Sequence, residues 1–273
     1  MTTGKKIRLS RLFDEISQKS VLIPLDHGAT VGPIEGLSNI SKVLNALGDE
    51  APAVQGLILH RGTAAYSLAP NRRLPAPLIL HLSASTALGC DPTHKVLVAQ
   101  VEEALRLGAD AVSVHVNLGV MSEKEMLRDL GQVANKCHMW GMPLLAMMYP
   151  KSVDAAAPMV PQLKLAARVA AELGADVVKV SYPGTVEAMQ EVVDGCFVPV
   201  VVAGGERSSS DNEVLNLVKD AINGGAMGVC IGRNVFQHGQ PGQFARRMSA
   251  IVHGTASEPR TRPFEVSSAV SLN

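Results

Sequence analysis

A single lysine interrupts one of the most apolar stretches of the chain. Lys179 lies in the run Val-Val-Lys-Val-Ser at 177–181. A buried ammonium without a partner is costly, so burial should lower the pKa of this amine. A neutral lysine amine is a nucleophile that forms a Schiff base with a carbonyl group. The alternative is a lysine at a strand end that reaches solvent. We favour a catalytic amine.

Two further residues could move protons beside this lysine. Tyr149 precedes Lys179 by one strand–helix unit, and Asp26 follows an apolar run within the sequence Asp-His-Gly. A phenol and a carboxylate are general acid–base groups that could assist imine chemistry. The alternatives are a partly buried tyrosine with a hydrogen-bonded hydroxyl and an aspartate that caps a turn. We predict catalytic roles for both residues.

Two glycine-containing loops predict a phosphate site. Gly204 and Gly205 follow the run at 199–203, and Gly232 and Arg233 end and follow the run at 227–232. Glycine allows backbone amides to approach an anion, and arginine offers two parallel donors, although tight turns also require glycine. Three more residues that follow apolar runs are expected to bind substrate: His27, Arg61 and Lys151.

A metal site is the competing interpretation of the same strand ends. His60, His81 and His115 end or follow apolar runs, and with Asp26 they could form a zinc site. However, the histidines lack the local spacing that is typical of metal ligands. We therefore expect neither a metal nor a cofactor.

The elements that must position these residues follow a regular rhythm. Short apolar runs, rich in β-branched residues and flanked by Gly or Pro, alternate with longer helical patterns, which is typical of buried parallel strands. Eight such units in one chain predict a single-domain TIM (β/α)8 barrel, an α/β fold whose active site lies at the carboxyl ends of the strands. An open doubly wound sheet is the alternative, but no GxGxxG follows the first run. The eight runs are 21–25, 56–60, 77–81, 111–116, 143–148, 177–181, 199–203 and 227–232.

Helical patterns separate several of these strands. We expect helices within 93–108, 122–141, 161–174 and 210–225. Ser122 and Glu125 form a capping-box sequence at the start of the second helix. The repeated phrase Leu-Gly-Ala-Asp, at 107–110 and 173–176, marks the turn from a helix into the next strand.

Composition limits the class of protein. The chain has 273 residues, with 25 Lys+Arg, 25 Asp+Glu and 3% aromatic residues, so nucleic acid is not an expected partner. The chain contains no apolar run as long as a membrane span and no signal-like N-terminus, and its four cysteines form no CxxC pair. These features predict a cytoplasmic protein without membrane association. We expect a barrel domain at 1–253 and a C-terminal extension at 254–273.

Five segments together carry a family resemblance. They are IPLDHG, WGMPLLAMMYP, ADVVKVSY, PVVVAGG and GRNVFQH. The chain resembles the archaeal-type class I aldolases from about Ile7 to His253, and within them the amino-heptulosonate synthases of aromatic amino acid and antibiotic biosynthesis. It departs from their pattern at Glu206 and Arg207, where relatives often have Pro-Lys, and at Arg61, where lysine is common.

The resemblance implies roles for the residues that match these motifs. It implies a Schiff base on Lys179, proton transfer by Tyr149, acid–base catalysis by Asp26, and phosphate binding by Gly204, Gly205, Gly232 and Arg233. It also implies a homo-oligomer, such as a decamer of two pentameric rings.

The resemblance further implies a reaction that joins L-aspartate semialdehyde to a three-carbon unit from a ketose phosphate. A class I fructose-bisphosphate aldolase is the alternative. A metal-dependent barrel enzyme and a non-catalytic phosphosugar-binding protein are less favoured.

Overall fold

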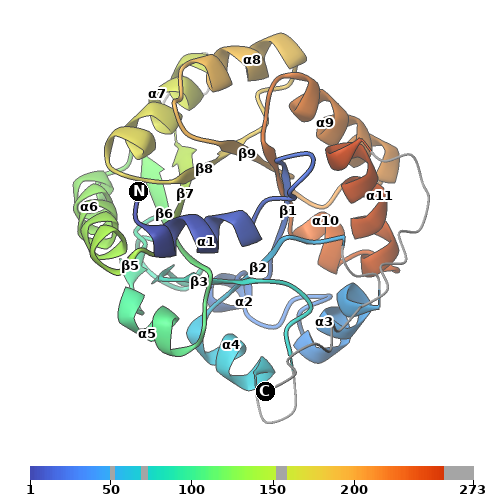
Figure 1. The fold of residues 1–273 in the computed structure, drawn as a ribbon, viewed down its shortest axis with the longest axis horizontal. Coiled ribbons are helices and arrows are strands. Elements are labelled where there is room, and N and C mark those ends of the chain that lie inside the picture. Colours follow the sequence, from blue (N-terminus) through green and yellow to red (C-terminus); the bar gives the residue numbers. More distant parts are fainter. Residues whose placement is uncertain (50–52, 69–72, 152–158, 255–273) are drawn as a thin grey trace, which may run out of the picture.

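The eight predicted strands form one closed parallel barrel. The computed structural model describes residues 1–49, 53–68, 73–151 and 159–254. Neighbouring strands follow the order β1-β10-β9-β8-β7-β6-β3-β2, which closes the sheet on itself and confirms the single-domain TIM barrel (Figure 1). The strands are β1 (Ser20–Pro24), β2 (Gly56–Leu59), β3 (Leu78–His81), β6 (Ala111–Leu118), β7 (Leu144–Pro150), β8 (Val177–Ser181), β9 (Val200–Ala203) and β10 (Gly228–Cys230).

Helices surround the barrel and cover the outer faces of its strands, as Figure 1 shows. Their buried faces consist largely of Leu, Val, Ala and Met, so a barrel with few aromatic residues still has a continuous core. The helices are α1 (Thr3–Arg11), α2 (Gly28–Val31), α3 (Ile40–Gly48), α4 (Arg61–Ser67), α5 (Val101–Arg106), α6 (Glu123–Trp140), α7 (Met159–Glu172), α8 (Val186–Asp194), α9 (Asp211–Asn223), α10 (Arg233–Phe236) and α11 (Pro241–His253).

The alternation of side chains along each strand decides which residues enter the barrel. Leu145 and Val177 belong to the cluster inside the barrel, whereas Ala146 and Val178 belong to the shell between strands and helices. Successive side chains on a strand point to opposite faces. Tyr149 and Lys179, at even spacing from Leu145 and Val177, therefore face the barrel interior near the carboxyl ends of β7 and β8.

The segment at 93–108 differs from its predicted helix. α5 begins only at Val101, and Val96–Leu97 form the short strand β5, which pairs antiparallel with β4 (Ser83–Ala84). The amide of Val98 donates to the carbonyl of Leu82 at 2.8 Å. Val98 and Val101 are three residues apart, which is a helical spacing and explains the wrong prediction. In the structure Val98 is exposed, and its amide bonds across the hairpin.

The start of α6 lacks the capping box that was predicted for it. The helix forms where it was predicted, but the side chain of Ser122 caps no amide of its first turn. Its hydroxyl donates instead to Asp91 Oδ2 at 3.1 Å. The capping-box prediction at Ser122 and Glu125 is therefore wrong, because Asp91, from the loop between β4 and β5, competes for the serine.

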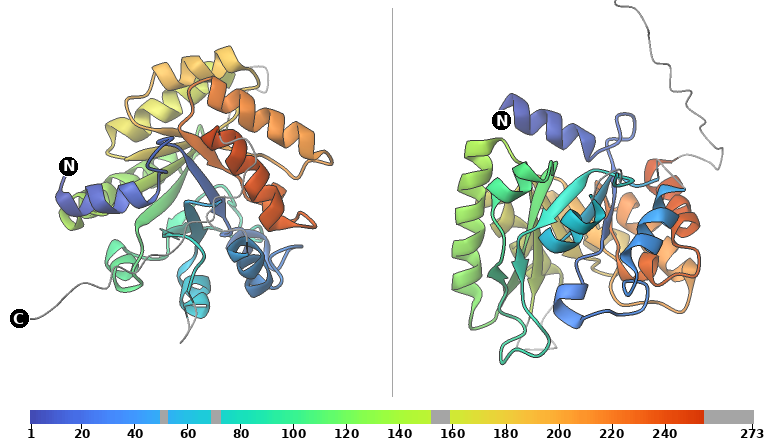
Figure 2. Two further views of the ribbon diagram at one scale, coloured as in Figure 1. Left: turned by 45° about the vertical axis from the view of Figure 1, so that its right-hand side comes forward. Right: turned by 90° about the horizontal axis from the view of Figure 1, so that it is seen from below.

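The N-terminal helix α1, which was not predicted, closes the opposite end of the barrel (Figure 2, right). Leu12, directly after α1, packs into the apolar cluster inside the barrel. Lys5 Nζ lies 2.8 Å from Asp176, and Arg11 Nη1 lies 2.7 Å from Asp110. Both aspartates belong to the repeated Leu-Gly-Ala-Asp phrase, so this repeat attaches α1 as well as starting two strands.

Two other predictions concern the limits of the chain. No helix in the described ranges combines the length and the apolar character that crossing a membrane requires. α11 ends at His253, and residues 255–273 of the predicted extension lie outside the described residues.

We predict that Asp176→Ala lowers the free energy of unfolding by about 3 kcal/mol, because it leaves the buried ammonium of Lys5 without a partner. Asp110→Ala is the matched control, since solvent can hydrate the exposed guanidinium of Arg11, and it should cost about 1 kcal/mol or less. Urea denaturation measures both values. Equal losses in the two variants would contradict a special role for the buried pair.

Candidate active site

Lys179 lies at the centre of the barrel mouth. Its side chain enters from β8, and the residue is only 5% exposed. The Nζ atom lies 5.9 Å from the centroid of the Tyr149 ring, which comes from the neighbouring strand β7. Cys230 of β10 and Asp26, which follows β1, act electrostatically on the same amine. The structure therefore brings together Lys179, Tyr149 and Asp26.

The charge of Lys179 differs from the sequence prediction. Burial opposes the ammonium, but Cys230, Tyr149 and Asp26 favour it, and the pKa of Lys179 lies above its ordinary value. Burial raises the pKa of Cys230 to about 11 and also raises the pKa of Tyr149, so both are protonated at neutral pH. Asp26 is thus the counter-charge at neutral pH. The predicted fall in pKa is wrong, because it considered burial without Cys230, Tyr149 and Asp26.

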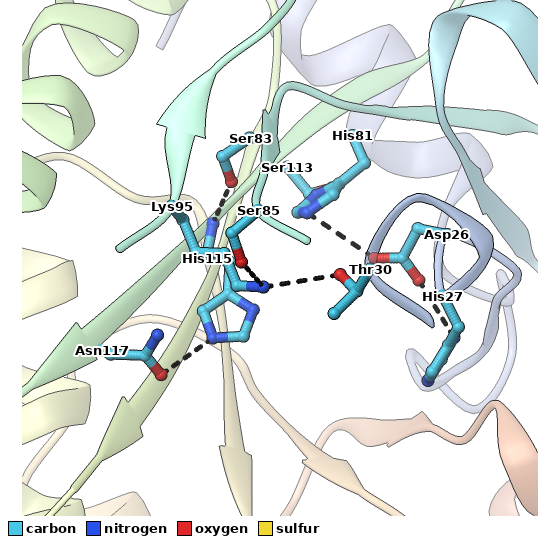
Figure 3. A network of polar contacts seen from close by, with 10 residues as sticks. All are labelled: Asp26, His27, Thr30, His81, Ser83, Ser85, Lys95, Ser113, His115 and Asn117. Carbon is cyan, nitrogen blue, oxygen red and sulfur yellow. Dashed lines mark hydrogen bonds and ion pairs between the residues drawn. The ribbon is translucent and has the colours of Figure 1, made fainter. Parts of the chain in front are cut away.

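Asp26 lies between two histidines. Its Oδ1 is 3.4 Å from His27 Nδ1, and its Oδ2 is 3.6 Å from His81 Nε2 (Figure 3). Burial opposes the carboxylate charge, but His81, His27 and Lys179 outweigh burial and lower the pKa of Asp26 to about 2. Asp26 is therefore ionised at neutral pH and can accept a proton or orient a hydroxyl group.

The histidines of the mouth take part in hydrogen bonds. His81 Nδ1 lies 2.8 Å from Ser113 Oγ, and His115 Nε2 lies 3.0 Å from Asn117 Oδ1. Burial lowers the pKa of His81 to about 4 and that of His115 to about 3, so both rings are neutral at neutral pH. Within the described ranges, no group of three His, Cys, Asp or Glu residues has an arrangement that could hold a metal ion.

One buried asparagine connects the two predicted phosphate loops. Asn234, in α10, is fully buried, and its Nδ2 donates to the carbonyls of Gly204 at 3.0 Å and Glu206 at 2.8 Å. Its Oδ1 accepts from the amide of Ser208 at 2.8 Å. The loop after β9 and the loop after β10 therefore form one rigid unit. Asn234 was not among the predicted site residues.

This unit offers several free donors to an anion. The amides of Gly204, Gly205 and Gly232 have no acceptor among the described residues. Gly205 has a φ of 71°, and a Cβ on Gly232 would lie 2.7 Å from the Pro24 carbonyl, so both positions favour glycine. The Nε of Arg233 is buried without a partner, whereas its Nη1 pairs with Glu206.

The other predicted binding residues lie in different surroundings. His27 packs edge-on against Phe236 of α10, with ring centroids 5.1 Å apart, and so links Asp26 to α10. Lys151 is exposed and acts electrostatically on Lys95. Arg61 points elsewhere: its Nη1 lies 2.9 Å from Glu103 of α5, and it lines a cavity of about 590 Å³ beside α5 and α6.

Lys95 is the cation of the mouth that sequence reasoning missed. It lies directly before β5, is 9% exposed, and its Nζ donates to Ser85 Oγ at 2.7 Å (Figure 3). The misassigned helix at 93–108 hid this residue, because a lysine near a helix start gives no reason to expect burial. A hairpin assignment for 83–97 could have revealed it.

The fold and the mouth together define a class of protein. A TIM barrel with a buried lysine, an ionised carboxylate and a tyrosine at the carboxyl ends of its strands has the components of a Schiff-base-forming aldolase. The sequence model of the DeoC/LacD family aldolases matches residues 20–238. The chain belongs to this family, and the protein is a Schiff-base-forming aldolase.

Individual relatives agree with this assignment. The chain is 42% identical over 260 residues to 2-amino-4,5-dihydroxy-6-oxo-7-(phosphonooxy)heptanoate synthase of Streptomyces griseus, covering 95% of this chain and 94% of the relative. It is 43% identical over 263 residues to 2-amino-3,7-dideoxy-D-threo-hept-6-ulosonate synthase 1 of Archaeoglobus fulgidus, covering 96% of each.

A solved structure extends the likeness to three dimensions. An archaeal fructose 1,6-bisphosphate aldolase superimposes with a TM-score of 0.83 at 28% identity, covering 92% of this chain and 99% of that chain.

Glu206→Gln tests whether the unit after β9 and β10 binds anions. The substitution removes the carboxylate that pairs with Arg233, so we expect inorganic phosphate to bind several-fold more tightly in isothermal titration calorimetry. Glu191→Gln is the control, because Glu191 pairs with Lys164 at 3.3 Å outside the mouth. Unchanged phosphate affinity in Glu206→Gln would show that Glu206 does not compete with an anion for Arg233.

A second prediction concerns the charge of Lys179. Because Asp26 raises the pKa of Lys179, Asp26→Asn should lower that pKa and increase the neutral fraction of the amine at a given pH. Competitive labelling with acetic anhydride at pH 8, read by peptide mass spectrometry, should then modify Lys179 several-fold faster. The exposed Asp194→Asn serves as control. Slower or equal labelling in Asp26→Asn would refute Asp26 as the counter-charge.

Proposed function

We propose that this aldolase joins L-aspartate semialdehyde to a three-carbon unit taken from a ketose phosphate, with Lys179 as the Schiff-base residue. The observation that carries the proposal is the position of the Lys179 amine. It is buried at the barrel mouth, facing Tyr149 and the ionised Asp26. Binding alone does not require a buried amine nucleophile, so this arrangement favours catalysis over a sugar-binding role.

In the proposed first step, the amine of Lys179 attacks the ketone carbon of the donor. Because Lys179 rests as an ammonium, it must first lose a proton to solvent; Asp26, with a pKa of about 2, stays ionised and is too weak a base to take that proton itself. The carbinolamine then loses its hydroxyl as water, with the proton supplied by Tyr149, and an iminium forms. The phosphate of the donor binds to Arg233 and the free amides of Gly204, Gly205 and Gly232.

In the second step, the iminium accepts the electron pair of the breaking carbon–carbon bond, and the donor hydroxyl gives its proton to Asp26 or Tyr149 as its aldehyde fragment leaves. The enamine that remains attacks the carbonyl carbon of L-aspartate semialdehyde, and the new alkoxide takes back that proton. Water then hydrolyses the new iminium and restores the Lys179 amine. This step consumes one water molecule, which equals the one released in the first step.

The choice of substrate rests on the relatives. The two synthases at 42% and 43% identity cover nearly the whole chain, whereas the fructose 1,6-bisphosphate aldolase is 28% identical. The likeness to this aldolase supports cleavage of fructose 1,6-bisphosphate as the second candidate reaction. Both candidates use phosphorylated substrates and the same lysine chemistry. A cytoplasmic location and a ring-shaped homo-oligomer stay predictions.

The first test of this proposal is trapping of the imine. Wild-type protein is incubated with fructose 1,6-bisphosphate or dihydroxyacetone phosphate and reduced with sodium borohydride, and the adduct is located by peptide mass. We expect one adduct, on Lys179. Lys179→Met preserves side-chain length and apolar character, so it should fold normally, form no adduct and lose at least about a thousandfold in turnover.

Lys164→Met, on the outer helix α7, is the matched control and should trap and turn over as wild type does. An adduct on another lysine, or normal turnover by a folded Lys179→Met, would refute the assignment. Supplying L-aspartate semialdehyde or glyceraldehyde 3-phosphate as acceptor then separates the two candidate reactions by their products.

A further inference from the structure

Lys95 is a buried cation held by neutral groups alone. Its Nζ donates to Ser85 Oγ at 2.7 Å and lies 3.5 Å from Thr30 Oγ1. Among the described residues, no carboxylate lies within ion-pair distance of this ammonium. A buried charge without an opposite charge is costly, and burial lowers the pKa of Lys95 as a result. The surroundings therefore favour an anion that arrives from outside.

The position of Lys95 is fixed by the hairpin that carries it. β4 and β5 pair antiparallel, with Ala84 opposite Val96, so Ser85 and Lys95 face each other where the two strands diverge. The amide of His115 donates to Ser83 Oγ at 2.8 Å, which attaches β4 to the barrel strand β6. The amide of Ala87 donates to the carbonyl of Thr30 at 2.9 Å, which attaches the loop to α2. The three groups are thus preorganised.

Lys95 belongs to the same mouth as Lys179. Both ammonium groups act electrostatically on His81 and His115, and Asp26 acts on both of them. Figure 3 shows Lys95 above the His115 ring, with Thr30 between it and Asp26. A molecule bound to Lys95 therefore lies in the same mouth as the proposed Schiff base.

We propose that Lys95, together with Ser85 and Thr30, binds the carboxylate of the acceptor aldehyde and so selects an acidic acceptor. The inference rests on the proposed function, because it assigns the second substrate of that reaction. Arg233 and the free amides of the loops after β9 and β10 supply the donors for a phosphate. One ammonium flanked by two hydroxyl groups matches a single negative charge, which a carboxylate carries and a phosphate dianion exceeds.

The test compares acceptors that differ only in this charge. Succinate semialdehyde and its neutral amide, 4-oxobutanamide, are supplied with the same donor to wild type, Lys95→Met and the exposed control Lys124→Met. In Lys95→Met we expect kcat/KM for succinate semialdehyde to fall about 10- to 100-fold, mainly through KM, and kcat/KM for the amide to change less than about threefold. L-aspartate semialdehyde should follow succinate semialdehyde.

Equal losses for the acid and the amide, or no loss for either, would overturn the inference. So would a loss confined to glyceraldehyde 3-phosphate, which would assign Lys95 to a phosphate. Borohydride trapping of the donor on Lys179 should persist in Lys95→Met. A failure of the proposed function, seen as absent trapping in wild type, is thus distinct from a failure of this inference.

A binding measurement tests the role of Lys95 without formation of a Schiff base. L-homoserine has the carboxylate of aspartate semialdehyde but an alcohol in place of the reactive aldehyde. In calorimetry, wild type should bind L-homoserine at least about tenfold more tightly than Lys95→Met does, and L-homoserinamide should not distinguish the two proteins. Equal affinity of both proteins for L-homoserine would refute the carboxylate site.

Discussion

The burial of a positive charge at Lys179 is the constraint on which the site depends. An ammonium inside an aliphatic barrel needs an opposite charge, and at neutral pH Asp26 supplies it, because Cys230 and Tyr149 remain protonated. His81, His27 and Lys179 together keep Asp26 ionised, with a pKa of about 2. Lys179 and Asp26 are therefore held in opposite charge states by one cluster of side chains, and loss of a proton from Lys179 to solvent would begin the chemistry.

The barrel can bear this charge at one end because the other end is tightly closed. Leu12 fills the bottom of the interior, and the pairs Lys5–Asp176 and Arg11–Asp110 attach α1 across it. Above this plug, aliphatic side chains such as Ile79 and Val201 fill the barrel up to the level of Lys179. The polar groups of the candidate site are thus gathered at the carboxyl ends of the strands, where burial and neighbouring groups shift the pKa values of Asp26, His81 and Lys179.

Sequence patterns predicted the strands well and the long-range partners poorly. All eight barrel strands lie where short aliphatic runs occur, because strands buried on both faces need such runs. The apolar neighbours of Lys179 in the run at 177–181 also predicted its burial. In contrast, α1 carries charges along its length, and its role depends on aspartates far away in sequence. Other features depend in the same way on contacts that no local sequence pattern encodes. They are the pKa of Lys179, the Arg61–Glu103 ion pair and the burial of Lys95.

Two cationic positions on different elements give the proposed reaction a direction across the mouth. Arg233 and the free amides follow β9 and β10, whereas Lys95 comes from the hairpin inserted between β3 and α5. In the proposed scheme, the donor phosphate and the acceptor carboxylate bind to these separate groups, with Lys179 and Asp26 in the same mouth. Because each anion has its own cation, the two substrates do not compete for one charge. With the two anions bound to separate cations, the aldehyde carbon of the acceptor would point toward the enamine of the donor. Electrostatic attraction would then orient the two substrates for bond formation as well as bind them.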